Sequence, residues 1–159
     1  MQKMACKEIL EAVNGSLICG DKDLEIYSIC TDSRKNVEGS LFVPLKGEKF
    51  DGHKYISEVF SRKASACITE EDIDYIENKT VIKVKDTKKA LIDIARYYRN
   101  KFKNIGIAIT GSVGKTTTKD MIASVLSQKY NCLKTIGNFN NEIGVPLTIL
   151  ISIVVMKLQ

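Results

Sequence analysis

The chain has 159 residues, enough for one ordinary domain or two small ones. Hydrophobic residues make up 44% of it and charged residues 27%, which is typical of a soluble globular protein and argues against wholesale disorder. The net charge of +5 comes from 24 basic and 19 acidic side chains spread along the chain, and no basic block or basic–aromatic pattern indicates nucleic-acid binding.

The cysteines and the N-terminal segment indicate a reducing compartment. The five cysteines are odd in number and widely spaced, and no two form a C-x-x-C pair, so we expect buried thiols rather than disulfides or a zinc site. The segment Met1–Glu8 is polar and lacks the apolar centre of a signal peptide, so we predict a cytoplasmic protein. The cysteines are Cys6, Cys19, Cys30, Cys67 and Cys132.

From Met4 to about Lys85, short elements alternate with turn signals, which predicts a small α/β unit. Apolar residues at helical spacing predict a helix at Ala5–Val13, ending at Asn14-Gly15, and another at Tyr55–Arg62. Runs rich in β-branched residues predict four strands, whose order in the sheet the sequence leaves open. The predicted strands are Glu25–Thr31, Ser40–Leu45, Ala66–Thr69 and Thr80–Val84.

The second region begins with a longer helix. An apolar stripe predicts a helix over Asp86–Phe102 with Asp86 as its N-cap, either as a linker or as the first helix of this region. A strand at Asn104–Thr110, a helix at Lys115–Lys129 and a strand at Asn131–Thr135 then form a predicted βαβ unit, which implies a parallel sheet. We therefore expect two domains, residues 1–85 and 86–159.

The segment Ile143–Met156 contains no charged residue. It is shorter than the roughly 20 residues that a membrane span needs, and it contains Pro146, so we predict a buried helix or strand of an α/β sheet and no membrane span. The chain stops three residues later, so we expect a truncated chain with an exposed apolar patch around Ile149–Val155.

The densest chemistry lies at Thr110–Thr118, which reads T-G-S-V-G-K-T-T-T between a predicted strand and a predicted helix. Glycines let backbone N–H groups approach phosphate oxygens, and the helix N-terminus directs its dipole at the same anion. Lysine can reach the β- and γ-phosphates of ATP, and the following threonine hydroxyl can ligate Mg²⁺. The motif is the shorter G-x-x-G-K-T form, with Ile109 where the common motif has its first glycine. The predicted cofactor-binding residues are Gly111, Ser112, Val113, Gly114, Lys115, Thr116 and Thr117.

Thr110–Lys119 resembles the ATP loop of the Mur ligases, the peptide-adding enzymes of cell-wall precursor synthesis. Thr31–Arg34, T-D-S-R, and Leu41–His53 resemble two further segments of that family. Gly137–Thr148, G-N-F-N-N-E-I-G-V-P-L-T, resembles the family members that add D-alanyl-D-alanine. The resemblance extends over about residues 4–150 in unbroken order. It implies the fold class, a small N-terminal α/β UDP-binding domain followed by the start of a P-loop parallel-sheet ATP-binding domain.

The resemblance also implies an activity and its site residues. The reaction would couple ATP hydrolysis, through an acyl phosphate, to the joining of UDP-N-acetylmuramoyl-tripeptide and D-alanyl-D-alanine in peptidoglycan synthesis, with Mg²⁺ as the metal. Ser33 and Arg34 would contact the UDP moiety, and a guanidinium suits a diphosphate. Lys115 would be catalytic and hold ATP. Thr116 and Glu142 would hold Mg²⁺, and the asparagines of the substrate loop, whose individual roles stay open, are Asn138, Asn140 and Asn141.

His53, the single histidine, is far in sequence from the ATP loop, so capping of a helix start or lining of a substrate pocket is favoured over catalysis. The sequence suggests no metal cluster around it. Two alternatives to the ligase remain open, another amino-acid-adding member of the family and a non-catalytic module that binds UDP-sugars or ATP. We expect that the short chain does not ligate by itself, and the sequence leaves its oligomeric state open.

Overall fold

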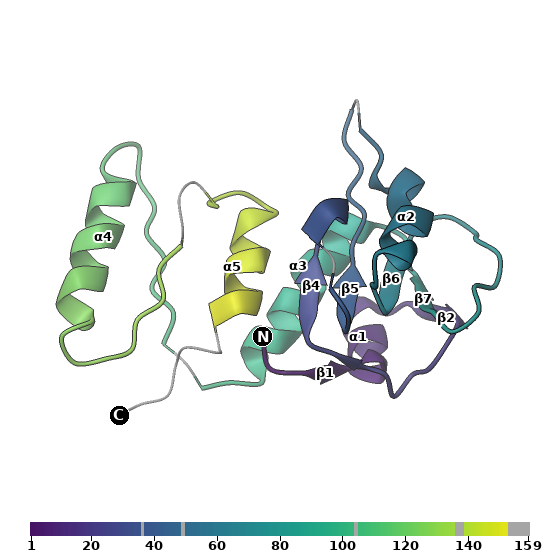
Figure 1. The fold of residues 1–159 in the computed structure, drawn as a ribbon. Coiled ribbons are helices and arrows are strands. Elements are labelled where there is room, and N and C mark those ends of the chain that lie inside the picture. The colour runs from purple at the N-terminus through teal and green to yellow at the C-terminus, as the bar shows by residue number, and fades with distance from the viewer. Residues whose placement is uncertain (36, 49, 104, 136–138, 153–159) are drawn as a thin grey trace.

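The structure is a computed structural model that describes residues 1–35, 37–48, 50–103, 105–135 and 139–152. A five-stranded sheet in the order β2-β7-β6-β5-β4 organises its N-terminal part (Figure 1). Strands β4 to β7 run parallel, and β2 joins the edge antiparallel to β7. The strands are β2 (Ser16–Cys19), β4 (Ser28–Cys30), β5 (Ser40–Phe42), β6 (Ala66–Thr69) and β7 (Thr80–Lys83).

Helices cover both faces of this sheet (Figure 1). On one face, α1 and α3 pack against inward-facing strand residues such as Leu41, Ile68 and Ile82. On the other face, α2 packs against the residues that alternate with these, among them Phe42 and Cys67. The alternation follows from the two-residue period of a strand. The helices are α1 (Cys6–Val13), α2 (Ile56–Ser61), α3 (Thr87–Asn100), α4 (Lys115–Leu126) and α5 (Gly144–Ser152).

The central strands are short but buried along almost their whole length, as expected for parallel strands with helices on both faces. This mixed α/β arrangement around a mainly parallel sheet confirms the predicted fold class. Strand β6 has the bounds predicted from the sequence, and β7 and β5 fall within their predicted ranges. Three of the five cysteines are buried and none forms a disulfide, as predicted for a chain of free thiols.

Two predicted helix ends are confirmed. Helix α1 ends at Asn14, which adopts the left-handed conformation with a φ of 48°. Helix α3 begins after Asp86, whose Oδ1 accepts a hydrogen bond from the backbone N–H of Lys89 at 2.8 Å. The apolar stripe of α3 packs into the core on the α1 side of the sheet, where Leu91, Ile94 and Tyr98 are fully buried.

The edge of the fold differs from the sequence prediction. The predicted strand Glu25–Thr31 is divided between β3 (Glu25–Ile26) and β4, because β3 pairs with β1 (Met4–Ala5) in a separate two-stranded ribbon. Strand β2 was not predicted. It is short and mostly exposed, so it lacks the apolar run by which the central strands are recognised.

The predicted strands at Asn104–Thr110 and Asn131–Thr135 were wrong for the residues that the structure describes. Residues 105–110 and 131–135 are extended segments on either side of α4, and no backbone–backbone hydrogen bond joins either segment to another described residue. A strand exists only through ladder bonds to a neighbour. Here a groove of about 560 Å³, lined by Ile105, Ile107 and Leu133 among others, separates the two segments and α4. Asn104 lies outside the described residues.

The apolar run near the C-terminus forms α5, and residues 153–156 of the run lie outside the described residues. Helix α5 packs against α3 and β4, and Leu150 is buried. The predicted apolar patch around Ile149–Val155 is therefore only partly correct, since Ile151 is exposed but Leu150 is covered. No described helix is long and apolar enough to cross a membrane.

Candidate functional site

The phosphate loop has the backbone geometry that its glycines predict. Gly111 has a φ of 152° and Gly114 a φ of 78°, and Gly114 is the residue from which α4 begins. A Cβ on Gly114 would meet no atom within 4 Å, so the need for glycine there comes from its conformation rather than from lack of space. The loop thus turns sharply and presents the first turn of α4 to solvent.

Lys115 lies at the start of α4 and folds back over this loop. Its Nζ donates hydrogen bonds to the backbone carbonyls of Gly111 and, at 3.4 Å, of Ser112. The ammonium therefore sits above the turn that the predicted ATP phosphates would occupy. Ser112, Val113, Thr116 and Thr117 are exposed, so the donors of the predicted cofactor-binding set are accessible together.

These donors fit a triphosphate. Backbone N–H groups at a helix N-terminus and a lysine ammonium suit phosphate oxygens. Mg²⁺ prefers oxygen ligands, which the Thr116 hydroxyl and the Glu142 carboxylate can supply. The segment that follows α4, residues 127–135, runs back along the helix (Figure 1), and Glu142 stands two residues before the start of α5.

The structure assigns local roles to part of the asparagine-rich loop. The Asn141 Oδ1 accepts hydrogen bonds from the backbone N–H groups of Ile143 at 3.2 Å and Gly144 at 2.7 Å, which caps α5. Gly144 is required there, because a Cβ on it would lie 2.4 Å from the Cα of Phe139. Asn140 is exposed, and Asn138 lies outside the described residues.

Glu142 forms an ion pair with Lys88 of α3. The Glu142 carboxylate raises the pKa of the Lys88 ammonium above its ordinary value. The side chain of Glu142 is 70% exposed, so the pair is a surface contact that a metal ion can replace. Sequence reasoning missed this contact, because Lys88 lies on the polar face of a helix from the other part of the chain.

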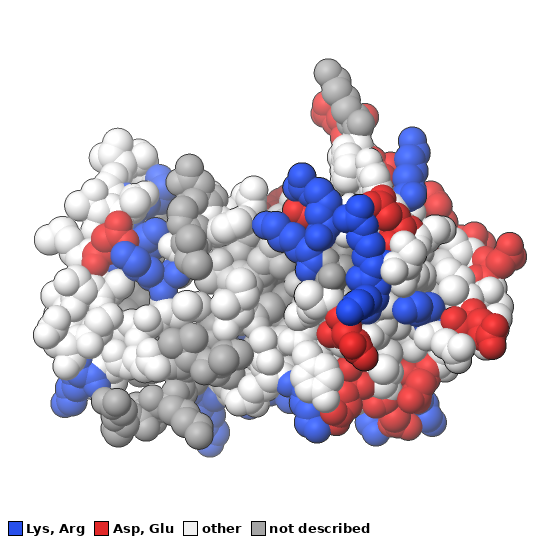
Figure 2. Space-filling model, viewed as in Figure 1, with Lys and Arg blue, Asp and Glu red and all other residues white. Residues whose placement is uncertain are grey.

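The predicted UDP-binding residues lie in the N-terminal sheet part of the chain, beside the edge strand β4, against which α5 packs. Ser33 and Arg34 belong to a 3₁₀ turn, η1 (Ser33–Lys35), that follows β4. Figure 2 shows basic side chains gathered over this turn, whereas the face around α4 carries few charges. The carboxyl ends of neighbouring parallel strands meet at one edge of a sheet, which is the usual ligand-binding edge of such folds.

Arg34 is held by Asp32. Its Nε and Nη2 each donate to an Asp32 carboxylate oxygen at 2.9 Å. The Arg34 guanidinium holds the pKa of the Asp32 carboxyl well below its usual range. A guanidinium carries five N–H donors, so a bidentate pair orients Arg34 without exhausting them. The side chain is 78% exposed and accessible to an anionic ligand.

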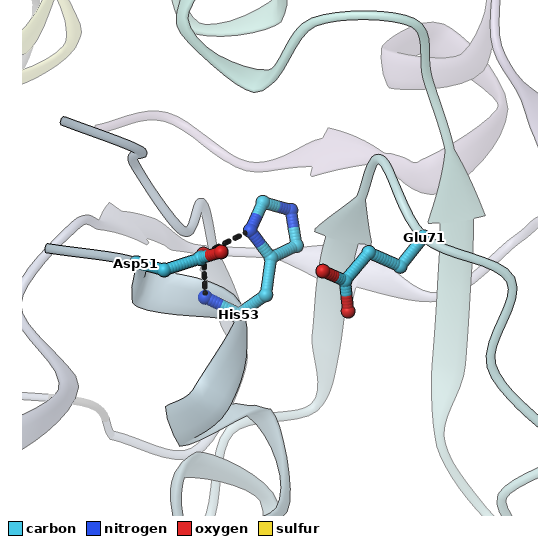
Figure 3. Close-up of side chains that lie close together, drawn as sticks. All are labelled: Asp51, His53 and Glu71. Carbon is cyan, nitrogen blue, oxygen red and sulfur yellow. Dashed lines mark hydrogen bonds and ion pairs between the residues drawn. The ribbon is translucent and has the colours of Figure 1, made fainter. Parts of the chain in front are cut away.

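A second polar group at this edge centres on His53, in the 3₁₀ turn η2 (Gly52–Tyr55) (Figure 3). His53 Nδ1 lies 2.7 Å from Asp51 Oδ1, and the same oxygen accepts the backbone N–H of His53 at 3.0 Å. On its other side, His53 Nε2 accepts the backbone N–H of Glu70 at 3.1 Å. Because Nε2 is an acceptor, the ring proton lies on Nδ1 and donates to Asp51.

The sequence suggested no metal cluster around His53, but the structure brings Asp51, His53 and Glu71 together with their ligand atoms within 4.8 Å of one another. Both ring nitrogens of His53 are already used in hydrogen bonds. The His53 ring therefore connects η2 to the end of β6. The N-cap of η2 is Asp51, so the structure does not show the helix-start capping by His53 that was one of its two expected roles.

Comparisons with known proteins find one family along most of the chain. Residues 25–99 match the model of the catalytic domain of the Mur ligase family, and residues 109–152 match that of the Mur ligase middle domain. The UDP-N-acetylmuramoyl-tripeptide--D-alanyl-D-alanine ligase of Bacillus subtilis is 43% identical over 152 residues, which are 94% of this chain and 33% of that protein.

Solved structures give the same result. A UDP-N-acetylmuramoylalanyl-D-glutamyl-2,6-diaminopimelate--D-alanyl-D-alanyl ligase from Acinetobacter baumannii superposes with a TM-score of 0.87 and 36% identity, covering 94% of this chain and 34% of that one. The MurF ligase of Thermotoga maritima in complex with ADP has a TM-score of 0.71 and 36% identity, with 77% and 28% coverage. This chain spans about a third of the length of these relatives.

The two family matches follow each other without overlap and together take in most of the chain, from β3 to α5. The resemblance first suggested by short motifs thus extends to 43% sequence identity over 152 residues and to the fold. The chain belongs to the Mur ligase family.

Proposed function

We propose that this chain is the substrate- and ATP-binding part of a ligase that joins D-alanyl-D-alanine to UDP-N-acetylmuramoyl-tripeptide. The observation that carries the proposal is the phosphate loop, in which Gly111 and Gly114 turn the backbone and Lys115 covers the turn. The names of the relatives supply the substrates, since the ligases from Bacillus subtilis and Acinetobacter baumannii are named for this reaction.

The proposed division of labour follows the two parts of the chain. Residues 1–85 bind the UDP moiety through Ser33 and Arg34, and residues 86–159 bind ATP, with α3 as the connecting helix. The asparagines Asn138, Asn140 and Asn141 belong to the substrate loop. The ADP complex of the Thermotoga maritima relative supports a nucleotide at the phosphate loop.

ATP and Mg²⁺ supply the phosphoryl group and the positive charge that convert a carboxylate of the tripeptide into an acyl phosphate. The chain's own contribution is positioning and charge compensation. Lys115 neutralises charge that develops on the transferred phosphoryl group, and Thr116 and Glu142 hold the metal ion. For Glu142 to do so, its carboxylate must exchange Lys88 for Mg²⁺. These steps take place inside the cell, where UDP-linked precursors and ATP are available.

Calorimetric titration of the 159-residue chain with UDP-N-acetylmuramoyl-tripeptide and, separately, with MgATP tests the proposal. We expect Arg34→Ala to weaken binding of the UDP substrate, and Lys115→Ala to weaken binding of MgATP, each by about tenfold or more, because each loses charged hydrogen bonds. Lys35→Ala, next to Arg34, and Lys129→Ala, beyond the far end of α4 from Lys115, each remove an exposed cation and serve as controls. A folded chain that binds neither ligand contradicts the proposal.

A further inference from the structure

The single histidine of the chain is buried, although its side chain can carry a charge. His53 lies in η2, and its side chain is only 2% exposed. Its Nδ1 lies 2.7 Å from Asp51 Oδ1, and its Nε2 accepts the backbone N–H of Glu70 at 3.1 Å. An acceptor at Nε2 requires the neutral ring, because an imidazolium donates from both nitrogens. The fold therefore holds His53 in its uncharged form.

The charged groups around this ring favour the opposite form. The Asp51 and Glu71 carboxylates stand on two sides of the ring, and one ligand atom from each of the three residues lies within 4.8 Å of the others (Figure 3). The nearby cations are turned to solvent: Lys46, 3.8 Å from the second Asp51 oxygen, is 60% exposed, and Lys54 of η2 is exposed as well. Two carboxylates so close to an imidazole attract a proton to it. Hydrogen bonding and charge thus oppose each other at this ring.

Protonation of the ring exchanges one set of partners for another. A proton on Nε2 faces the Glu70 N–H, so two donors meet and the hydrogen bond between them is lost. The charged ring keeps Asp51 as an acceptor and finds a second acceptor in the Glu71 carboxylate. Because Glu71 is exposed, its side chain can turn toward the ring. The neutral and the charged ring therefore each have two partners, and only Asp51 is common to both sets.

The hydrogen bond that is exchanged joins two parts of the sheet unit. It ties η2 to Glu70, the residue that follows β6. The carboxylate of the same Glu70 accepts hydrogen bonds from the backbone N–H of Thr87 at 2.7 Å and from its hydroxyl at 2.8 Å. Thr87 is fully buried at the start of α3. The His53 ring therefore acts on a residue that also holds the first turn of a core helix.

We propose that His53 is a proton-operated switch, which ties η2 to the backbone of Glu70 when neutral and releases that tie to pair with Asp51 and Glu71 when protonated. A histidine changes charge between about pH 5 and pH 8. Because the neutral ring makes the tie, the tie is complete at the upper end of this range and is lost as the pH falls. The inference is independent of the proposed function, since all the groups involved belong to the sheet unit.

Nuclear magnetic resonance of the whole chain tests the switch. The chain has one histidine, so the ring C–H protons of His53 give a single titration curve, and the amide signal of Glu70 reports the tie. We expect the two signals to move together between pH 8 and pH 5 with the same midpoint. Hydrogen exchange at the Glu70 amide, corrected for the intrinsic effect of pH, is expected to become about fivefold faster or more. A ring that titrates without any change at Glu70 contradicts the proposal, and so does a ring that stays neutral down to pH 5.

Two variants separate the two sets of partners. In His53→Gln, the side-chain carbonyl accepts the Glu70 N–H at every pH, so we expect the Glu70 signal to stay constant from pH 8 to pH 5. Glu71→Gln removes the partner of the charged ring and is expected to lower the midpoint of both signals by about half a pH unit. Its matched control is Glu77→Gln, which removes another exposed carboxylate of the segment between β6 and β7 and is expected to leave the midpoint unchanged.

The two variants also carry the results that overturn the switch. If the Glu70 signal of a folded His53→Gln variant still changes over the same pH range, another group titrates there and the switch is wrong. Glu71→Gln alters an exposed residue, so a loss of folding is not expected and this test stands even where His53→Gln does not fold. If Glu71→Gln keeps the wild-type midpoint, the charged ring has no partner in Glu71, and the switch is again wrong.

Discussion

The sheet unit, made of β1–β7 with α1–α3, and the α4 unit, residues 105–135, bury their apolar residues to different degrees. In the sheet unit, two layers of helices cover the faces of the sheet, and residues such as Leu91 and Tyr98 are fully buried. In the α4 unit, Ile105 is 87% exposed, and Met121 and Val125 on α4 are 65% and 71% exposed. A phosphate loop can therefore keep its local geometry although the described residues on either side of α4 form no sheet.

The local geometry survives because it depends on neighbours in sequence. The turn at Gly111–Gly114 and the first turn of α4 use backbone conformations and short-range hydrogen bonds, such as that from Thr118 N–H to the Gly114 carbonyl at 2.9 Å. A parallel strand instead needs partners from distant segments. The two units can therefore be distinguished by variants that act on packing and variants that act on loop conformation.

The largest expected difference is in core packing. Leu91→Ala removes a fully buried side chain from α3 and is expected to lower the free energy of unfolding by about 2–5 kcal/mol. Met121→Ala, on the exposed face of α4, is expected to change it by less than about 0.5 kcal/mol. Urea denaturation followed by circular dichroism measures both. Equal effects from the two variants would show that α4 is packed as tightly as α3.

Next in size is a conformational effect confined to the phosphate loop. Gly114→Ala places a Cβ on a residue with a φ of 78°, which costs about 1–2 kcal/mol in the loop and is expected to weaken MgATP binding by about tenfold. Its control is Gly106→Ala, where the nearest atom to an added Cβ is Arg99 Nη2 at 3.6 Å and binding is expected to stay unchanged. Titration calorimetry measures both, and wild-type affinity in Gly114→Ala would exclude the left-handed turn as a binding requirement.

A hydrogen bond from Gln2 ties the N-terminal residues to α3. The backbone N–H of Gln2 donates to the hydroxyl of Tyr98 at 2.7 Å, and the Tyr98 ring is buried against Phe102. Tyr98→Phe keeps the ring and is expected to lower the free energy of unfolding by about 1 kcal/mol. Hydrogen exchange of the first few amides would increase in parallel. No change in either measurement would mean that this hydrogen bond does not help to hold the N-terminal segment.

The smallest effect expected concerns pH and the contact between Asp51 and His53 at the start of η2. The backbone N–H of His53, together with its ring, lowers the pKa of the Asp51 carboxyl below its ordinary value. A depressed pKa means that the stabilisation is present above the pKa of the unfolded chain and is lost as pH falls through the folded-state pKa. Asp51→Asn is expected to lower Tm slightly at neutral pH and to converge with the wild type in acid. A constant difference at all pH values would contradict the role of the carboxylate.

Sequence reasoning succeeded where a pattern is local. The period of α3, its Asp86 cap, the left-handed end of α1 at Asn14 and the bounds of β6 all follow from residues within one element. The glycines and Lys115 of the phosphate loop belong to this class, and their backbone geometry agrees with the prediction. The ligand roles of most site residues remain predictions, because the position of a side chain alone does not show which ligand it contacts.

The rest depended on contacts between distant segments. Nothing near Asp51 in the sequence indicates that His53 reaches the backbone of Glu70, or that Glu70 caps α3. The ion pair between Lys88 and Glu142 joins residues far apart in the chain. The predicted strands beside α4 were wrong for the same reason. An apolar segment has the composition of a strand, but it forms one only when a neighbouring strand pairs with it.

Native-state hydrogen exchange measured by mass spectrometry compares the two units most directly. We expect strong protection in β6, β7 and α3, and rapid exchange in residues 105–110 and 131–135, which make no backbone–backbone hydrogen bonds to other described residues. MgATP is expected to slow exchange in residues 111–118, and UDP-N-acetylmuramoyl-tripeptide to slow it in residues 32–35. Equal protection of the two units in the free chain would contradict the account.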